Sequence, residues 1–328
     1  MTIRAVFTGM ASALMMSSAL LASSAMAETK IRLGHVLADT HSWHIASTGF
    51  AKEVAEKTGG RVKIDIFPSG QLGSEKEVIE GMQIGAVEGG LIGSGSFQFV
   101  EPKLGIIEMP YAWKSREQAF AALDGRLGTS LADILRPKGI EVLAWWENGF
   151  RHVTNNKHPI NTPADLAGLK IRVTPDKVRL ATFEALGAQP APLAFGELYS
   201  ALQQGVFDAQ ENPLSIIDSS SFHEVQKFAS MTGHIWGAAT LTVSSTTWAQ
   251  ISPEDQALVR EAAVKWGNEQ RNMVAQNETA LVEKLKAAGM QFNDVNKEEF
   301  AKALGPIWDS QEDVFGPELL AVMDEYCK

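Results

Sequence analysis

Two arginines and one amide are the side chains of this sequence whose chemistry is easiest to assign. Arg151 ends a Gly-Phe-Arg segment, Arg172 ends a Gly-Leu-Lys-Ile-Arg segment, and Asn212 lies in a Gln-Glu-Asn-Pro segment. A guanidinium offers parallel N–H donors that match the two oxygens of a carboxylate. If compact αβ units bring the three side chains together, they form a site for an organic acid.

The segments around these residues alternate between strand and helix patterns. In the first half, strands are expected at 31–36, 62–67 and 85–92, and helices at 42–57 and from a capping box at 74–77 towards Ile84. The second half repeats the order, with strands at 170–173 and 206–210 and helices at 177–186 and 197–204. This β-α-β order predicts an α/β fold with a parallel-type sheet, and two such units predict two lobes with a cleft between them.

A long helix is expected after these units. Ser252 is the predicted N-cap, Pro253 is at N1, and good helix formers continue to Ala288, where Gly289 ends the pattern. One such helix would be longer than a small domain and would brace both lobes. The alternative is two helices that are broken near Gly267.

The expected domain division follows from these patterns. Domain I comprises residues 28–149 plus 238–277, and domain II comprises residues 150–237 plus 278–328. The chain would cross between the lobes more than once, which makes a hinge.

The first 27 residues have the features of a secretory signal peptide. Arg4 is followed by an apolar, small-residue run from Ala11 to Ala22, and Ala-Met-Ala at 25–27 predicts cleavage after Ala27. The alternative, a membrane anchor, needs about 20 predominantly apolar residues, and serines interrupt this run. Cys327 is the one cysteine, so no lipid anchor or internal disulfide is expected, and a periplasmic location fits best.

Composition limits the partners. The chain of 328 residues carries a formal net charge of −10, which argues against a nucleic-acid partner. The same charge repels an anionic ligand at long range, so a site for an acid must concentrate positive charge locally. A soluble monomer is expected.

Four further segments occur in order along the chain: Thr-Pro at 174–175, Leu-Gly-Ala at 186–188, Phe-Gly-Glu-Leu-Tyr-Ser-Ala-Leu-Gln at 195–203, and Gln-Glu-Asn-Pro at 210–213. With them, the chain from residue 31 to about 289 resembles the solute-binding subunit of tripartite ATP-independent periplasmic (TRAP) transporters, of the C4-dicarboxylate-binding DctP type. The resemblance implies a two-lobe periplasmic binding protein fold with hinge strands and a single long helix common to both lobes. It also implies a receptor that captures an organic acid and delivers it to membrane permease subunits.

The resemblance also implies roles for four residues. Arg172 would form a salt bridge with the ligand carboxylate, Arg151 would be a second anion donor, and Asn212 an amide partner. Phe195 would be an aromatic wall against the carbon skeleton of the ligand. Without the resemblance, Arg172 would be interpreted as a solvated edge residue that shares a strand face with Lys170.

The chain departs from the sialic-acid-binding branch of that family. Gly93 stands where that branch has a glutamate, and Pro175 stands where it has an asparagine. A smaller hydroxylated acid, such as a uronate, an aldonate or another hydroxy acid, therefore fits better. Arg179 is either a ligand contact or a surface charge.

Further ligand-binding candidates have weaker support. His35 and Glu75 lie at the ends of a predicted strand and helix that would face the cleft, and Trp236 is a third candidate. A metal site at the histidines of segment 35–44 is an alternative, but no convincingly spaced fourth ligand is present, so a capping or cleft hydrogen-bond role is favoured. No metal or other cofactor is expected.

Motifs for catalysis are mostly absent. The sequence has no P-loop and no dinucleotide-binding glycine motif, and Lys-Thr-Gly at 57–59 lacks an accompanying Ser-x-x-Lys. The chain is therefore not expected to be an enzyme. Two alternatives stay open: a periplasmic enzyme that acts on a small carboxylate, and a ligand receptor for a sensor kinase.

Overall fold

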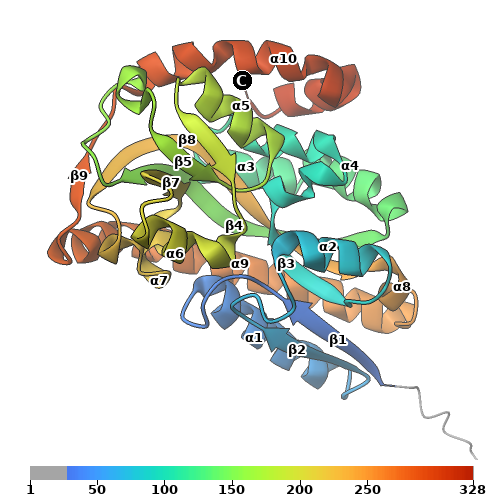
Figure 1. Cartoon of the computed structure of the whole chain (residues 1–328). Coiled ribbons are helices and arrows are strands. Elements are labelled where there is room, and N and C mark those ends of the chain that lie inside the picture. The colour runs from blue at the N-terminus through green and yellow to red at the C-terminus, as the bar shows by residue number, and fades with distance from the viewer. Residues whose placement is uncertain (1–27, 328) are drawn as a thin grey trace, which may run out of the picture.

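The computed structural model describes residues 28–327, in which a nine-stranded sheet carries helices on both faces (Figure 1). The predicted signal peptide lies outside the described residues. The strands are β1 Thr29–Gly34, β2 Val62–Phe67, β3 Gly89–Gly93, β4 Ile140–Asn155, β5 Lys170–Val173, β6 Gln189–Pro192, β7 Ala209–Asn212, β8 Phe228–Ser244 and β9 Gln291–Asn293. The helices are α1 Ser42–Lys57, α2 Glu75–Gln83, α3 Arg116–Leu123, α4 Arg126–Leu135, α5 Lys177–Ala185, α6 Leu198–Gln203, α7 Leu214–Ser219, α8 Ser245–Trp248, α9 Pro253–Ala287 and α10 Lys297–Asp324.

Two long strands join the two halves of the sheet. The strand order is β2-β1-β3-β8-β4-β7-β5-β6, with β9 beside β8. The groups β2-β1-β3 and β7-β5-β6 are parallel within themselves, whereas β4 and β8 pair antiparallel along nearly their whole lengths and connect them. This arrangement confirms the two-lobe α/β fold with hinge strands. The residue boundaries expected for the two domains stay a prediction.

Most of the short elements are confirmed, and two strands begin three or four residues late for the same reason. Gly85 and Gly205 end helices α2 and α6 with φ of 71° and 72°. The next backbone N–H groups then donate back into the helix, as from Ala86 to Gly81 (2.8 Å) and from Val206 to Ala201 (2.9 Å). Such a C-terminal cap occupies residues that the sequence pattern had assigned to the strands.

Helix α9 is continuous, so the alternative of two helices broken near Gly267 is wrong. The side chain of Ser252 caps it by accepting from the backbone N–H of Asp255 at 3.1 Å. Gly267 is required by packing, because a Cβ there would lie 2.6 Å from Cδ1 of the buried Trp146. The Trp146 indole also donates to the carbonyl of Ala263 at 3.0 Å, which fixes β4 on the helix.

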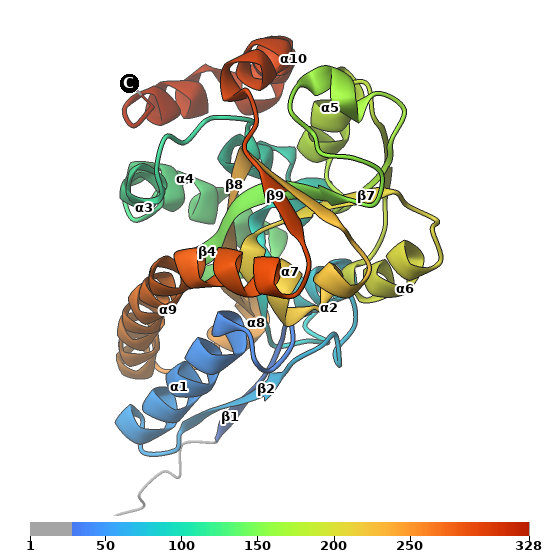
Figure 2. The same cartoon turned by 90° about the vertical axis from the view of Figure 1, so that its left-hand side faces the viewer.

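The long helix contacts both halves of the molecule. It packs against α1 beside the first group of strands and against α7 beside the second, with β4 between them (Figure 2). The expectation that α9 braces both lobes is therefore confirmed.

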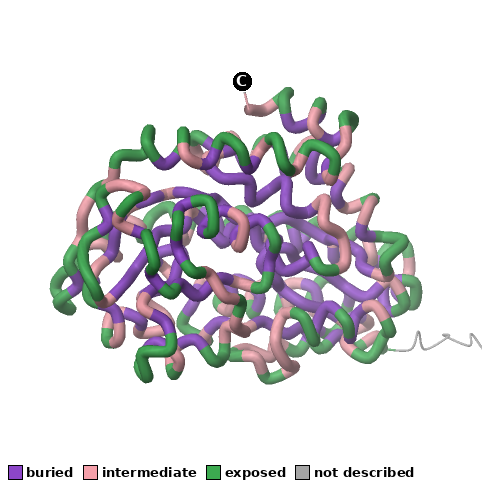
Figure 3. Tube along the Cα trace, turned by 45° about the horizontal axis from the view of Figure 1, so that its top comes forward, coloured by how far each residue is buried: buried purple, intermediate pink, exposed green. Residues whose placement is uncertain are grey.

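The core lies on both faces of the sheet. Neighbouring residues of β3 and β8 belong to different buried clusters, as for Leu91 and Ile92 or Ala238 and Ala239, because successive strand residues point to opposite faces. Strands β4 and β8 are buried along almost their entire length (Figure 3).

Candidate functional site

The candidate site is a cavity where the ends of several strands meet. A small inner chamber of about 30 Å³ adjoins an outer cavity of about 380 Å³. The two share Glu75, Ser96, Arg172, Thr174 and Phe195. The carboxyl ends of parallel strands are where ligands collect in open α/β sheets.

Arg172 is the buried cation of this chamber that forms no salt bridge within residues 28–327. Strand β5 lies between β7 and β6, so Arg172 is 1% exposed and the interpretation as a solvated edge residue is wrong. Its Nε and Nη2 donate to the carbonyl oxygen of Leu193 at 2.9 and 2.6 Å. Its Nη1 is buried without a hydrogen-bond partner among residues 28–327. Burial lowers the pKa of Arg172 to about 9, so the guanidinium stays charged at neutral pH.

Arg151 also reaches the chamber, but its charge is compensated within the protein. Its Nε and Nη2 bind the carboxylate of Glu211 at 2.5 and 2.8 Å, and Nη2 donates to Asn212 Oδ1 at 2.8 Å. The Asn212 amide in turn donates to Gln210 at 2.5 Å. Burial raises the pKa of Glu211, but Arg151 and Arg179 outweigh it and hold that pKa below its usual range. Arg151 therefore fixes Asn212 at the wall of the chamber.

Arg179 is a buried residue with internal partners. It is 1% exposed, so the alternative of a surface charge is wrong. It pairs with Glu108, with Asp176 at 3.1 Å, and donates to the Thr174 hydroxyl at 2.6 Å. Burial lowers the pKa of Arg179, but these carboxylates outweigh burial and raise it. The pair of Arg179 on α5 with Glu108, which lies in the segment 102–108 before α3, ties the two halves together next to the chamber.

Phe195 and Glu75 line both cavities, as a ligand-binding role requires. The Arg172 guanidinium carbon lies 5.9 Å from the centre of the Phe195 ring. Glu75 begins α2, and its carboxylate accepts from the Gly93 N–H at 2.8 Å and from the Ser96 hydroxyl at 2.5 Å.

Two weaker candidates lie apart from the chamber lining. Trp236 is buried, packs edge-on against Trp113, and donates to Glu147 Oε1 at 3.3 Å. His35 contacts His44, with 3.2 Å between their ring nitrogens, and its neighbours 36 and 37 line the chamber instead. Burial lowers the pKa of His35 to about 3, so its ring is neutral at physiological pH.

The favoured capping role for the histidine segment is confirmed at His41. It is the N-cap of α1, and its Nδ1 accepts from the backbone N–H of Trp43 at 3.1 Å. Among residues 28–327, no group of three or more His, Cys, Asp or Glu side chains is arranged to hold a metal ion.

Asn148 and Trp43 also line the chamber, and the sequence interpretation missed both. Asn148 lies in a bulge of β4, which is a tertiary feature without a sequence motif. Trp43 is the second residue of α1, and its indole N–H donates to the carbonyl of Glu147 at 2.9 Å. A large aromatic residue in the first turn of the predicted helix 42–57 was the available signal.

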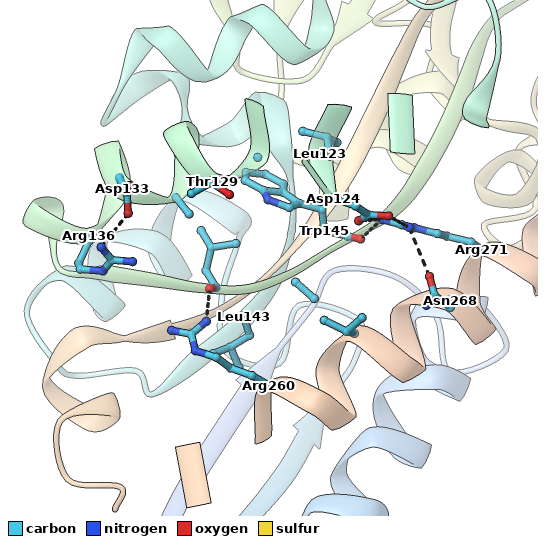
Figure 4. A pocket seen from close by; sticks show the side chains of 15 residues that line it. Leu123, Asp124, Thr129, Asp133, Arg136, Leu143, Trp145, Arg260, Asn268 and Arg271 are labelled. Carbon is cyan, nitrogen blue, oxygen red and sulfur yellow. Dashed lines mark hydrogen bonds and ion pairs between the residues drawn. The ribbon is translucent and has the colours of Figure 1, made fainter. Parts of the chain in front are cut away.

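A separate cavity of about 420 Å³ is lined by residues of α4, β4 and α9 (Figure 4). Its arginines are held by carboxylates of the protein, so it offers no free positive charge to an acid. The pairs are Arg136 with Asp133, Arg260 with Glu141 and Arg271 with Asp124.

Comparison with known proteins agrees with this geometry. Residues 33–313 match the family described as bacterial extracellular solute-binding protein, family 7, of the DctP type. The 2,3-diketo-L-gulonate-binding periplasmic protein of Escherichia coli is 35% identical, over 92% of this chain and 94% of that protein. In the part of the chain that the structure describes, no helix is long and apolar enough to cross a membrane.

Solved structures show the same fold. A TRAP periplasmic solute-binding protein of Polaromonas sp. JS666 with bound D-erythronate has a TM-score of 0.87 and 38% identity, covering 90% of this chain and 98% of that chain. The sugar-acid-binding protein of Advenella mimigardefordensis in complex with galactonate has a TM-score of 0.88 and 30% identity, covering 92% and 100%. The chain therefore belongs to the family 7 extracellular solute-binding proteins, the solute-binding subunits of TRAP transporters.

Proposed function

We propose that this protein captures a hydroxylated monocarboxylic acid, a sugar acid or small hydroxy acid, and delivers it to TRAP permease subunits in the membrane. The observation that carries the proposal is the buried guanidinium of Arg172, which forms no salt bridge and has a buried Nη1 without a hydrogen-bond partner among the described residues. An isolated buried charge costs several kcal/mol unless it is paired. A ligand carboxylate provides the missing partner.

The other site residues complete the proposal. Phe195 forms the wall against the carbon chain of the ligand, and Asn212, held by Arg151, offers an amide. Arg179 supports the chamber through Glu108 and Thr174. Relatives with bound D-erythronate, galactonate and L-gulonate support a sugar acid as ligand.

The inner chamber of about 30 Å³ is too small to hold such an acid by itself, so the two halves would separate to admit it fully. The strands β4 and β8 would bend during this motion. Closure would then remove water and strengthen each hydrogen bond to the ligand. The protein would work as a monomer in the periplasm after cleavage behind Ala27, without cofactor and without changing its ligand.

Calorimetry with four acids tests the proposal: D-erythronate, galactonate, L-gulonate and succinate. At least one hydroxy acid should bind, and mass spectrometry should recover it unchanged. Turnover of a bound acid would favour the periplasmic enzyme instead. Absence of binding by every hydroxy acid in a wider panel would contradict the proposed ligand class.

A further inference from the structure

Asn148 occupies a bulge of β4 beside the inner chamber, and its buried side chain lacks a hydrogen-bond partner among the described residues. In the β4–β8 pairing, Glu147 is opposite Ala238 and Gly149 is opposite Gly237, so Asn148 is the extra residue of a bulge. Gly149 has a φ of 118°, a backbone conformation that favours glycine. A bulge redirects the side chain of the extra residue, and bulges are common next to functional sites.

The Asn148 side chain is buried but unsatisfied. The residue is 6% exposed and lines the inner chamber together with Arg172. Its Oδ1 is buried without a hydrogen-bond partner among the described residues. A buried polar atom without a partner costs free energy, so a donor from a ligand would satisfy it.

Glu75 faces the same space. A Cβ placed on Gly93 would lie 3.5 Å from Asn148 Nδ2 and 3.4 Å from Glu75 Oε1, so the two side chains flank this glycine. Glu75 is held there by the Gly93 N–H and the Ser96 hydroxyl. The glycine leaves open a space bordered by one amide and one carboxylate.

The chemistry of this pair restricts the group that can face it. A carboxylate only accepts hydrogen bonds, whereas an amide both accepts and donates. A hydroxyl can donate to Glu75 or to Asn148 Oδ1 and accept from the amide. A second carboxylate on the ligand would be repelled by Glu75 and could not donate to Asn148.

We propose that Asn148 and Glu75 together select a hydroxyl group on the carbon chain of the ligand and reject dicarboxylates. This inference rests on the proposed function, in which the carboxylate of the ligand binds Arg172. It attributes the preference of the site for hydroxy-monocarboxylates to the bulge residue of β4 and the acidic residue that begins α2.

Two four-carbon acids form a matched probe pair. D-erythronate carries one carboxylate and three hydroxyls, whereas succinate carries two carboxylates and none. In calorimetry, the unmodified protein should bind D-erythronate at least about tenfold more tightly than succinate. Asn148→Leu should weaken D-erythronate by about tenfold or more, the size of one or two lost hydrogen bonds, and leave succinate nearly unchanged.

Glu75→Gln provides a gain-of-binding readout that a structural defect would not produce. The variant removes the charge and keeps the shape, so succinate should bind severalfold more tightly while D-erythronate binds more weakly. Thermal melting should show that both variants remain folded. Glu75→Gln also keeps the proposal testable if Asn148→Leu does not fold.

The outcomes separate this inference from the proposed function. If D-erythronate binds and Arg172→Ala abolishes binding, but the ratio of the two affinities is unchanged in Asn148→Leu and Glu75→Gln, the hydroxyl-selecting pair is refuted alone. If succinate binds the unmodified protein as tightly as D-erythronate, the inference also fails. If neither D-erythronate nor any other hydroxy acid binds, the proposed function itself fails.

Discussion

Replacing Arg172 is the perturbation that separates its two proposed effects, on affinity and on stability. In Arg172→Ala, the ligand carboxylate loses a bidentate partner and stays desolvated. The loss should be about 2–5 kcal/mol by comparison with truncated buried charge pairs. At about 1.4 kcal/mol per tenfold change, the dissociation constant should rise by a factor of roughly 30 to several thousand. Arg172→Lys should recover little, because an ammonium keeps the charge but loses the planar fork.

The ligand-free protein should respond in the opposite direction. Arg172 is buried and donates to a neutral carbonyl, so an apolar residue of similar length removes a buried charge that forms no salt bridge among the described residues. Arg172→Met should therefore raise the free energy of unfolding without ligand while it weakens binding. Lys170→Ala is the matched control, because it removes a positive charge from the exposed end of the same strand and should leave affinity unchanged.

Calorimetry with D-erythronate and urea denaturation of the ligand-free variants measure the two effects. Near-native affinity in both Arg172→Ala and Arg172→Lys would refute the reasoning. The carboxylate would then bind elsewhere, with Arg151 as the next candidate. A loss of stability in Arg172→Met would show that the charge is compensated in the ligand-free protein.

Three further predictions concern stability. Burial raises the pKa of Glu147 to about 7, above its ordinary 4.5, so between these pH values the folded state holds a proton that the unfolded state releases, and the free energy of unfolding should fall as pH rises from about 4.5 to 7. In urea denaturation, Glu147→Gln should make the free energy of unfolding depend less on pH. An unchanged pH dependence would exclude this group as the cause. Arg179→Met leaves the Glu108 carboxylate buried without its cation and should lower the free energy of unfolding by about 3–5 kcal/mol. Adding Glu108→Gln should restore part of this loss. Additive losses of stability in the double-mutant cycle would mean that the pair is not coupled. Gly267→Ala should destabilise the protein by about 1–3 kcal/mol because the added Cβ meets Trp146. Gly305→Ala should stabilise it, because Gly305 is in a helix and an added Cβ there has no neighbouring atom within 4 Å. Equal effects of the two changes in thermal denaturation would contradict the packing argument.

The short αβ units could be predicted because their signals are local. Caps at Ser74 and Ser252, helix-ending glycines and two-residue alternation each act within a few residues. The long strands β4 and β8 lack that alternation, because both of their faces are buried. Helix α10 was not anticipated either, since Gly316 and Pro317 look like the end of a helix; the backbone does kink there, with a φ of 75° at Gly316.

In the candidate site too, local sequence features could be predicted and features that depend on tertiary structure could not. Arg172 could be found because a local sequence segment resembles that of a known family, but its lack of a partner depends on strand order and burial. The partner of Arg179 is Glu108, far away in the sequence, so spacing could not distinguish an ion pair from a surface charge. No sequence motif marked Asn148, because its bulge depends on how β4 and β8, which are far apart in the sequence, pair with each other.

The distribution of charge in the chamber explains how binding can be coupled to closure. Arg151 and Arg179 have carboxylate partners inside the protein, so their contribution to the closed state does not depend on ligand. Arg172 is different, because it donates to a carbonyl oxygen. In the proposed binding mode, closure with ligand would bury its charge against a carboxylate instead. A ligand shifts a conformational equilibrium only by its differential affinity for the two states. The 2–5 kcal/mol assigned above to the Arg172 contact exceeds the roughly 2.8 kcal/mol needed for a hundredfold shift over most of its range. In the proposed mechanism, one guanidinium without a salt bridge would therefore be sufficient to make closure depend on the acid, and the paired arginines would hold the rest of the chamber in shape.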